Sequence, residues 1–226
     1  FAYELGVIVH EGIKRMYRDG EHIYYYLTVE NDNYIHPPMP EGVHDGILKG
    51  MYKFKNADTK NDLHAQLFGS GAILNEAIKA AEILDSNYGV TANIWSITSY
   101  KELHRDAKAT DRWNMLHPAE TPRKSYIEST LENEDGVFVL ASDYVKALPD
   151  SIARWFPQPI QALGTDGFGL SEARAELRDH FEVDARFITI ATLTALAKKG
   201  AIETSVITQA MTDLDIQPEK ENPELH

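Results

Sequence analysis

The apolar positions at the start of the chain follow a helical period. They recur at steps of three or four residues across residues 2–17 and therefore share one face of a helix. The next apolar run, residues 23–29, is dense in aromatic and β-branched side chains and predicts a buried strand. Asparagines, prolines and Gly42 make residues 30–42 a loop. A short helix or turn is expected over residues 47–54. The helical positions are Leu5, Val9, Ile13 and Met16.

Beyond residue 62 the pattern alternates between strands and helices, which predicts an α/β fold with a three-layer, mainly parallel sheet covered on both faces. Ile188 and Ile190 alternate as in a strand, but an N-cap at Asp184 and the terminal Gly200 favour a helix there. Strands are predicted over 63–68, 90–98, 137–141 and 160–163. Helices are predicted over 72–88, 99–116, from a cap at Ser142 to about 156, from about 171, and over 184–199. A long loop with Pro118 and Pro122 follows the second of these helices, and 217–226 form a polar tail.

A polar, aperiodic stretch at residues 55–62 divides the chain, and we place a domain boundary there. The chain begins with Phe1 at the edge of a helical stretch. We interpret this start as the cut end of a fragment.

The net charge of the chain argues against some classes of binding partner. Lys and Arg number 22 against 35 Asp and Glu, a net charge of −13, and no basic patch is present. A surface of this sign repels phosphate backbones and anionic lipid, so nucleic acid and membrane are poor partners. The longest mostly apolar run, residues 187–197, is shorter than the ~20 residues of a membrane span. The chain has no cysteine, which excludes thiolate chemistry and favours a reducing compartment.

The motifs for phosphate or metal chemistry are weak. Gly69-Ser70-Gly71 lies between a strand and a helix, but the dinucleotide fingerprint fails at Leu74, so a tight turn is the better interpretation. None of the nine histidines has metal-ligand spacing. His104, His117 and His180 are typical of partly exposed structural histidines, and Trp95, Trp113 and Trp155 of core or interface aromatics.

Two loops carry the candidate chemistry. His36 follows a predicted strand in a proline-rich loop that also holds Asn31, Asn33 and Tyr34, and such loops often place functional groups. Asp166 lies among three glycines in the stretch GTDGFG at 164–169. It either has a functional role, or it bonds its own turn and caps the next helix.

Several stretches, in order along nearly the whole chain, resemble one family. The chain is similar to the C-terminal portion of the homodimeric decarboxylating component of the bacterial pyruvate dehydrogenase complex, which is transketolase-like. It departs from the family pattern at Leu170, where Arg is usual, and at Glu172, so a contact made by that Arg is in doubt. The stretches are FAYELGVIVHEGIKRMY at 1–17, YYYLTVENDNY at 24–34, PPMPEGVHDGILKGMYKF at 37–54, GSGAILNEAIKAAEIL at 69–84, WSITSYKELHRDA at 95–107, DRWNMLHPAETPR at 111–123, GTDGFGLSEAR at 164–174, HFEVDARFI at 180–188 and NPEL at 222–225.

The resemblance implies a domain division and a cofactor. Residues 1–57 would be the end of the middle, pyrimidine-binding α/β domain, and residues 62–226 the transketolase-like C-terminal domain. The parent would hold thiamine diphosphate and Mg²⁺ between other regions, through a Gly-Asp-Gly motif and an activating Glu. Neither is expected here, so we predict no catalytic, cofactor-binding or metal residues in this chain. Asn31, Asn33, Tyr34, His36 and Asp166 are candidates for an active-site approach or an interface.

By the same resemblance, the parent would decarboxylate pyruvate and reductively acetylate a lipoyl group of the dihydrolipoyl acetyltransferase, feeding acetyl-CoA synthesis after glycolysis. It would be a homodimer in the bacterial cytoplasm. The chain itself would contribute scaffold and dimer surface and would be inactive alone. Two alternatives stay open, namely a fragment of another transketolase-like thiamine enzyme, and a stand-alone, non-catalytic interaction module.

Overall fold

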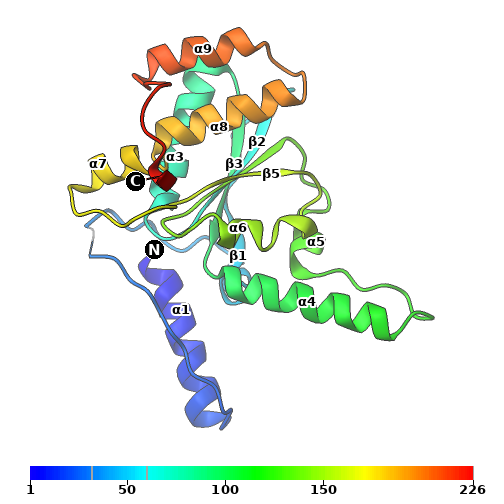
Figure 1. Cartoon of the computed structure of the whole chain (residues 1–226). Coiled ribbons are helices and arrows are strands. Elements are labelled where there is room, and N and C mark those ends of the chain that lie inside the picture. The colour runs from blue at the N-terminus through cyan, green and yellow to red at the C-terminus, as the bar shows by residue number, and fades with distance from the viewer. Residues whose placement is uncertain (32, 60, 226) are drawn as a thin grey trace.

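The computed structural model describes residues 1–31, 33–59 and 61–225. Asp32 in the predicted loop, Lys60 in the predicted boundary and His226 in the predicted tail lie outside that part of the chain. The first helix, α1 (Ala2–Ile13), continues as a π-helical turn, Lys14–Arg18. It projects away from the rest of the chain (Figure 1). Residues 19–31 and 33–43, here called the linker, lead from this turn back to the sheet, and their first part runs alongside α1 (Figure 1).

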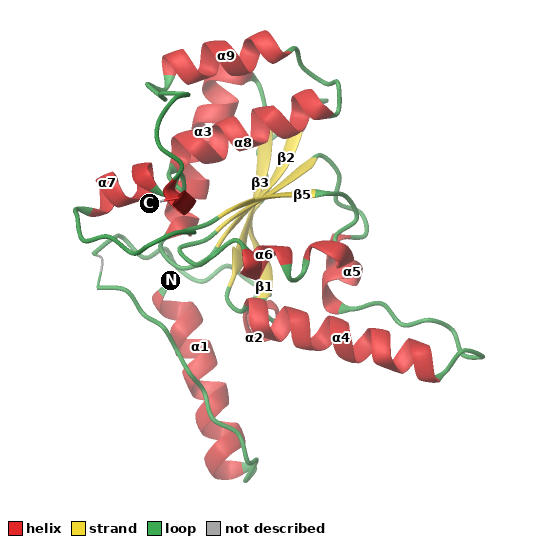
Figure 2. Cartoon of the chain, viewed as in Figure 1, coloured by secondary structure: helices red, strands yellow, loops and turns green. Residues whose placement is uncertain are grey.

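A sheet of mainly parallel strands forms the centre of the molecule (Figure 2). Within the described residues the strand order is β1-β3-β2-β4-β5, and β1 alone is antiparallel, at the edge against β3. Strands β2, β3 and β4 are buried at every residue, as expected for near-continuous apolar runs covered on both faces. The strands are β1 (Met51–Lys55), β2 (His64–Gly69), β3 (Thr91–Ile97), β4 (Val137–Ala141) and β5 (Ile160–Leu163).

Helices cover both faces of the sheet, which gives the three layers predicted from the sequence. On one face, α3, α8 and α9 bury Leu84, Leu193 and Ala210 against β2 and β4. On the other face, α4, α5 and the 3₁₀ turn at Ala153–Trp155 enclose Phe68, Trp95 and Phe138. The helices after α1 are α2 (His44–Lys49), α3 (Ile73–Tyr88), α4 (Tyr100–Leu116), α5 (Tyr126–Leu131), α6 (Ala147–Asp150), α7 (Arg174–His180), α8 (Ala185–Lys198) and α9 (Thr204–Asp213), and a 3₁₀ turn spans Pro223–Leu225.

Most of the predicted elements are confirmed, and local signals explain why. The Asp184 carboxylate accepts hydrogen bonds from the backbone N–H of Arg186 and Phe187 at 2.9 and 3.2 Å, which starts α8 where the sequence predicts it. Gly200 has a φ of +73° at the helix end. The ambiguous stretch is therefore helical. The predicted strands β4 and β5 have the expected bounds.

The predicted buried strand over residues 23–29 is wrong. These residues form neither helix nor strand, and Tyr24 and Tyr26 are each 84% exposed. A strand needs a ladder partner, and none of the five strands of the sheet pairs with this segment. The segment lies instead against α1 and the π-helical turn after it, where the Arg15 guanidinium donates to the Tyr25 hydroxyl at 3.1 Å.

Other boundaries also differ from the predictions. Residues 47–54 contain the end of α2 and most of β1, so a strand was missed there. Ser142 caps no helix, because its hydroxyl accepts from Ser70 and from the Tyr144 N–H, and Pro149 confines the helix that follows to α6. Helix α7 begins at Arg174 rather than near 171, and α5 and α9 were not predicted. The predicted domain division between residues 57 and 62 stays a prediction. β1, just before it, belongs to the same sheet as the strands after it.

Candidate functional site

The loops that follow β2 and β4 meet at the carboxyl edge of the sheet. β2 and β4 are parallel, and the order in which strands are added to the sheet reverses between them, since β3 lies on one side of β2 and β5 lies beyond β4. In open α/β sheets, ligands bind at such a reversal. Here the Ser70 hydroxyl donates to the Ser142 hydroxyl at 3.0 Å and joins the two loops. Gly69-Ser70-Gly71 is the tight turn that the sequence predicts.

The linker occupies this edge. The Glu30 carboxylate accepts a hydrogen bond from the Ala72 N–H at 3.4 Å, at the N-terminal end of α3. The Tyr144 hydroxyl donates to Thr28, and the Arg174 guanidinium donates to the side-chain oxygen of Asn31 at 2.6 Å. Residues 28–31 are thus attached to the loops after β2 and β4 and to the start of α7.

Acidic side chains gather beneath this segment. Asp143, two residues beyond the end of β4, interacts with the carboxyl group of Glu30. Burial raises the pKa of Asp143 to about 8, and the neighbouring carboxyl group of Glu30 adds to the rise. The positive charge of Arg178 on α7 lowers the pKa of Asp143 and so opposes this rise. Arg178 also lies 3.4 Å from the carboxylate of Glu76 on α3, with which it forms an ion pair. The Asp143 carboxyl group can therefore hold a proton near neutral pH.

The predicted candidate residues do not form one site. Asn31 of the linker accepts a hydrogen bond from Arg174 at the start of α7, as above. The Ala2 N–H donates to His36 Nδ1 at 3.0 Å, and the His36 ring lies 4.8 Å from the Tyr34 ring, so both of these residues lie at the start of α1. Asn33 is exposed. The two other loop residues, Tyr34 and His36, contact each other, and His36 also accepts a hydrogen bond from the backbone of α1.

Asp166 lies elsewhere and follows neither half of its predicted structural role. It accepts a hydrogen bond from the Lys146 N–H at 3.0 Å, and its carboxylate lies 3.4 Å from the Lys146 ammonium group. It thus ties the loop after β5 to the loop after β4. It does not cap α7, whose N-cap is Ala173 without a side-chain bond.

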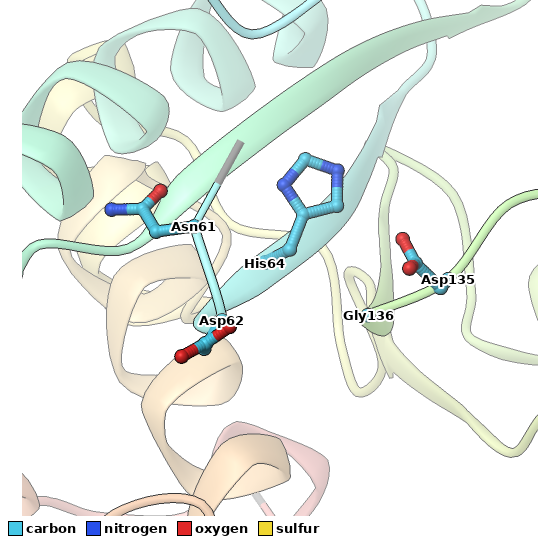
Figure 3. A pocket seen from close by; sticks show the side chains of 5 residues that line it. All are labelled: Asn61, Asp62, His64, Asp135 and Gly136. Atoms are coloured by element: carbon cyan, nitrogen blue, oxygen red, sulfur yellow. The ribbon is translucent and has the colours of Figure 1, made fainter. Parts of the chain in front are cut away.

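A polar hollow of about 420 Å³ opens at the opposite edge of the sheet (Figure 3). His64 at the start of β2 is buried, and its Nδ1 lies 2.8 Å from the Thr91 hydroxyl. No group of three His, Asp or Glu side chains in the described residues is placed to hold a metal ion. No signal in the sequence points to this hollow, because its residues are separated along the chain and match no motif. They are Asn61, Asp62, His64, Asp135 and Gly136.

A smaller hollow of about 260 Å³ lies between α4 and the 3₁₀ turn. His104 contacts the Trp155 ring there, with ring centroids 5.8 Å apart. The Trp155 indole N–H is 3.2 Å from the Asp111 carboxylate, which also pairs with Arg154. These contacts agree with the structural role expected for His104 and Trp155.

Two models of known families match the chain. A model described as the transketolase-like C-terminal domain matches residues 50–184, and a model of the pyruvate dehydrogenase E1 component middle domain matches residues 1–37. The first covers more than half of the chain. The chain belongs to the transketolase-like C-terminal domain family. This confirms the fold class predicted from the sequence.

Curated relatives extend the similarity over the whole chain. Proteins named pyruvate dehydrogenase E1 component from Pseudomonas aeruginosa and Escherichia coli K12 are each 44% identical to it, over 99% and 100% of its length. The chain spans 25% of the length of each. The resemblance to the C-terminal portion of this component is therefore confirmed.

Solved structures also match. A split-gene transketolase, described as an inactive β4 tetramer, is 17% identical over 66% of this chain and 43% of its own, with a TM-score of 0.46. Transketolase from Leishmania mexicana is 17% identical over 69% of this chain and 19% of its own, with the same TM-score of 0.46.

The family implies thiamine diphosphate, and the residues of this transketolase-like domain do not fit its binding. The sequence contains no Gly-Asp-Gly. At the carboxyl edge of the sheet, the backbone N–H that would suit a diphosphate, that of Ala72, already donates to Glu30. The Glu30 carboxylate at this N–H, together with the Glu76 carboxylate of α3, would repel a diphosphate. Among the described residues, no helix is long and apolar enough to cross a membrane.

Proposed function

We propose that this chain is the C-terminal structural portion of a pyruvate dehydrogenase decarboxylating component. The observation that supports this most is the 44% identity along 99% of the chain to a relative four times longer. The parent would decarboxylate pyruvate with thiamine diphosphate and Mg²⁺ and reductively acetylate the lipoyl group of a dihydrolipoyl acetyltransferase. It would act as a homodimer in the bacterial cytoplasm.

In that function, this chain serves as scaffold and supplies surface for the contact between the two subunits. Its first helix and linker carry apolar side chains that face solvent and have no covering element among the described residues. Such a surface is typical of a face that packs against further protein. The exposed members are Leu5, Val9, Ile13, Tyr17, Tyr24, Tyr26, Leu27, Val29, Ile35 and Met39.

Inactivity of the chain alone is part of the proposal. Purified chain, supplied with pyruvate, thiamine diphosphate, Mg²⁺ and an artificial electron acceptor, is expected to give no CO₂ above background. The full-length protein from the same source is the positive control. Turnover by the 226-residue chain would overturn the proposal.

Two experiments separate the alternatives. Full-length protein that acts on sugar phosphates but not on pyruvate would favour another transketolase-like enzyme, a class that the C-terminal domain model also fits. An immunoblot of source cells measures the native mass. A band several times heavier than 25.5 kDa supports a fragment of a large enzyme, whereas a band at 25.5 kDa would favour a stand-alone module.

The candidate approach residues are tested in the full-length enzyme. His36→Ala and Asp166→Ala would each lower kcat without lowering the melting temperature if they act in the reaction. Asn31→Ala, Asn33→Ala and Tyr34→Phe extend the series along the loop. Loss of stability with unchanged kcat would assign a residue to structure alone.

A further inference from the structure

The C-terminal tail, residues 217–225, is exposed along most of its length but contacts the domain at two points. It runs from the end of α9 towards α7 (Figure 1). Ile216, just before it, still belongs to the hydrophobic core. Within the tail, only Lys220 and Pro223 are shielded from solvent. The tail therefore starts where the core ends and is attached again through these two residues and their neighbours.

The first contact is at the C-terminal end of α7. The Lys220 ammonium group donates to the carbonyl oxygen of Asp179 and, at 3.3 Å, to that of His180, and it lies 4.7 Å from the centre of the Phe187 ring. The last carbonyl groups of a helix have no partner within the helix, and a cation beside them is favourable. Because α7 has seven residues and none of them is buried, it depends on such contacts more than a long helix does.

The second contact fixes the loop that leads from β5 to α7. Pro223 is buried, and its carbonyl oxygen lies so close to Gly167 that a Cβ there would be 1.9 Å away. The neighbouring Glu224 pairs with Lys146 at 2.8 Å, and Lys146 also binds Asp166. The tail thus contacts the segment between β5 and α8 near its beginning and again at the end of α7.

This segment has little attachment of its own to the core. Residues 167–174 are exposed throughout. Leu177 packs against the core, and Arg178 lies 3.4 Å from the Glu76 carboxylate on α3. Residues 164–180, here called the flap, start at the carboxyl end of β5 and are held there largely by the tail.

We propose that residues 217–225 are a releasable strap that holds the flap in place at the carboxyl edge of the sheet. With the strap docked, Lys220 closes the end of α7 and Pro223 fixes the loop before it. With the strap detached, the flap loosens while the sheet and its covering helices stay folded. Ligands of open α/β sheets bind at this edge, so the strap sets how open the edge is. This inference concerns the chain itself and does not rest on the proposed function.

Hydrogen exchange followed by mass spectrometry compares the full 226-residue chain with a chain that ends at Ile216. The reporters are the amides of residues 177–180, which are hydrogen-bonded at α7. We expect them to exchange about tenfold faster in the shortened chain, because local opening of α7 becomes easier. The amides of β4, which is buried at every residue, should exchange alike in both chains. Unchanged exchange in α7 would overturn the strap, and so would an equal rise in β4, which would mean that the tail stabilises the whole domain.

Point variants assign the effect to the Lys220 contact. Lys220→Gln removes the cation at the end of α7 and should speed exchange there about fivefold. Lys220→Arg keeps the charge and should exchange as the parent does. Lys198→Gln removes an exposed cation from the last turn of α8 and is the matched control. If Lys198→Gln speeds exchange in α7 as much as Lys220→Gln, a general effect of charge is responsible and the proposed contact is overturned.

Salt is the condition that should release the strap. The ion pair between Lys146 and Glu224 is partly exposed, so it is screened as ionic strength rises. Exchange in α7 of the parent chain should become about threefold faster between about 0.05 and about 1 M NaCl. The chain that ends at Ile216 should show no such change, because the remaining pair of Arg178 with Glu76 is largely buried. Equal salt dependence in the two chains would overturn release by salt.

Discussion

The Tyr52 hydroxyl donates a hydrogen bond of 2.8 Å to the carboxylate of Glu4, 48 residues earlier in the chain. The Ser96 hydroxyl donates to the same oxygen. Tyr52 belongs to β1 and Ser96 to the neighbouring β3, so one carboxylate joins α1 to two strands. Glu4 is only 8% exposed. A buried carboxylate is tolerated where hydrogen bonds satisfy it, and these donors fix where the first helix leaves the sheet.

Glu4→Ala should therefore detach α1 from the sheet edge. The substitution leaves two buried hydroxyls without their acceptor, which we expect to lower the free energy of unfolding by about 2–4 kcal/mol. Urea denaturation followed by circular dichroism measures this. Glu11→Ala on the same helix removes a carboxylate whose partner is the nearby Lys14, and it should cost only about 0.5 kcal/mol. Equal losses in the two variants would contradict the prediction.

The same contact makes stability sensitive to alkaline pH. Burial raises the pKa of Tyr52, and the negative charge of Glu4 raises it further. The unfolded chain then loses the tyrosine proton near pH 10 while the folded chain keeps it. The contribution to stability is complete below pH 10 and falls as pH rises above that value, by up to about 1.4 kcal/mol per unit.

Tyr52→Phe should remove the contribution of Tyr52 to the fall of the unfolding free energy with pH. Unfolding free energies measured between pH 9 and pH 11 should fall less steeply in this variant than in the parent, whatever its stability at pH 9. Tyr24→Phe changes an exposed tyrosine of the linker and is the matched control. A parallel slope in Tyr52→Phe would show that Tyr52 does not carry the effect.

Local signals predicted most of the domain, and long-range contacts explain the failures. The Asp184 cap and the apolar runs of β2, β3 and β4 are encoded within a few residues, so those elements were found. The run at 23–29 has the composition of a strand, but a strand also needs a partner strand, and no strand of the sheet pairs with this segment. The pairing of Glu30 with Asp143 joins residues more than a hundred positions apart, and no pattern in the sequence announces it.

The GTDGFG stretch shows how a motif can be recognised and still be misread. Its glycines suggested a special backbone path, which the structure confirms at Gly167, with a φ of +101°. The cause is the C-terminal tail, because a Cβ on Gly167 would lie 1.9 Å from the carbonyl oxygen of Pro223. Lys146 then bridges Asp166 and Glu224, at 3.4 and 2.8 Å. The glycine at position 167 is thus explained by the C-terminal tail, which packs against it.

Gly167→Ala should release the tail. Its side chain cannot fit against Pro223, and positive φ is costly for alanine, so we expect a loss of about 1–3 kcal/mol and faster carboxypeptidase trimming. Gly169→Ala, two residues on, meets no atom within 4 Å and has no positive φ, so it should behave as the parent. Trimming at equal rates in both variants would exclude the docked tail.

The exposed apolar face of α1 should make the chain associate with itself at high concentration. Val9 and Ile13 are 39% and 53% exposed on one side of the helix, and burying such area contributes about 25 cal/mol per Å². Sedimentation velocity should show a weight-average mass that rises with protein concentration. Val9→Lys combined with Ile13→Lys should suppress the rise in mass, because association would then bury two lysine charges away from water.

Met115→Lys is the control that shows whether association depends on the α1 face or on any exposed apolar side chain. Met115 is 71% exposed near the end of α4, far along the chain from α1. If association uses α1, this variant associates as the parent does. Should Met115→Lys suppress association as strongly as the α1 pair, the contact surface lies on α4 instead. A chain that stays monomeric at every concentration would mean that the first helix needs a specific partner surface, which a second copy does not supply.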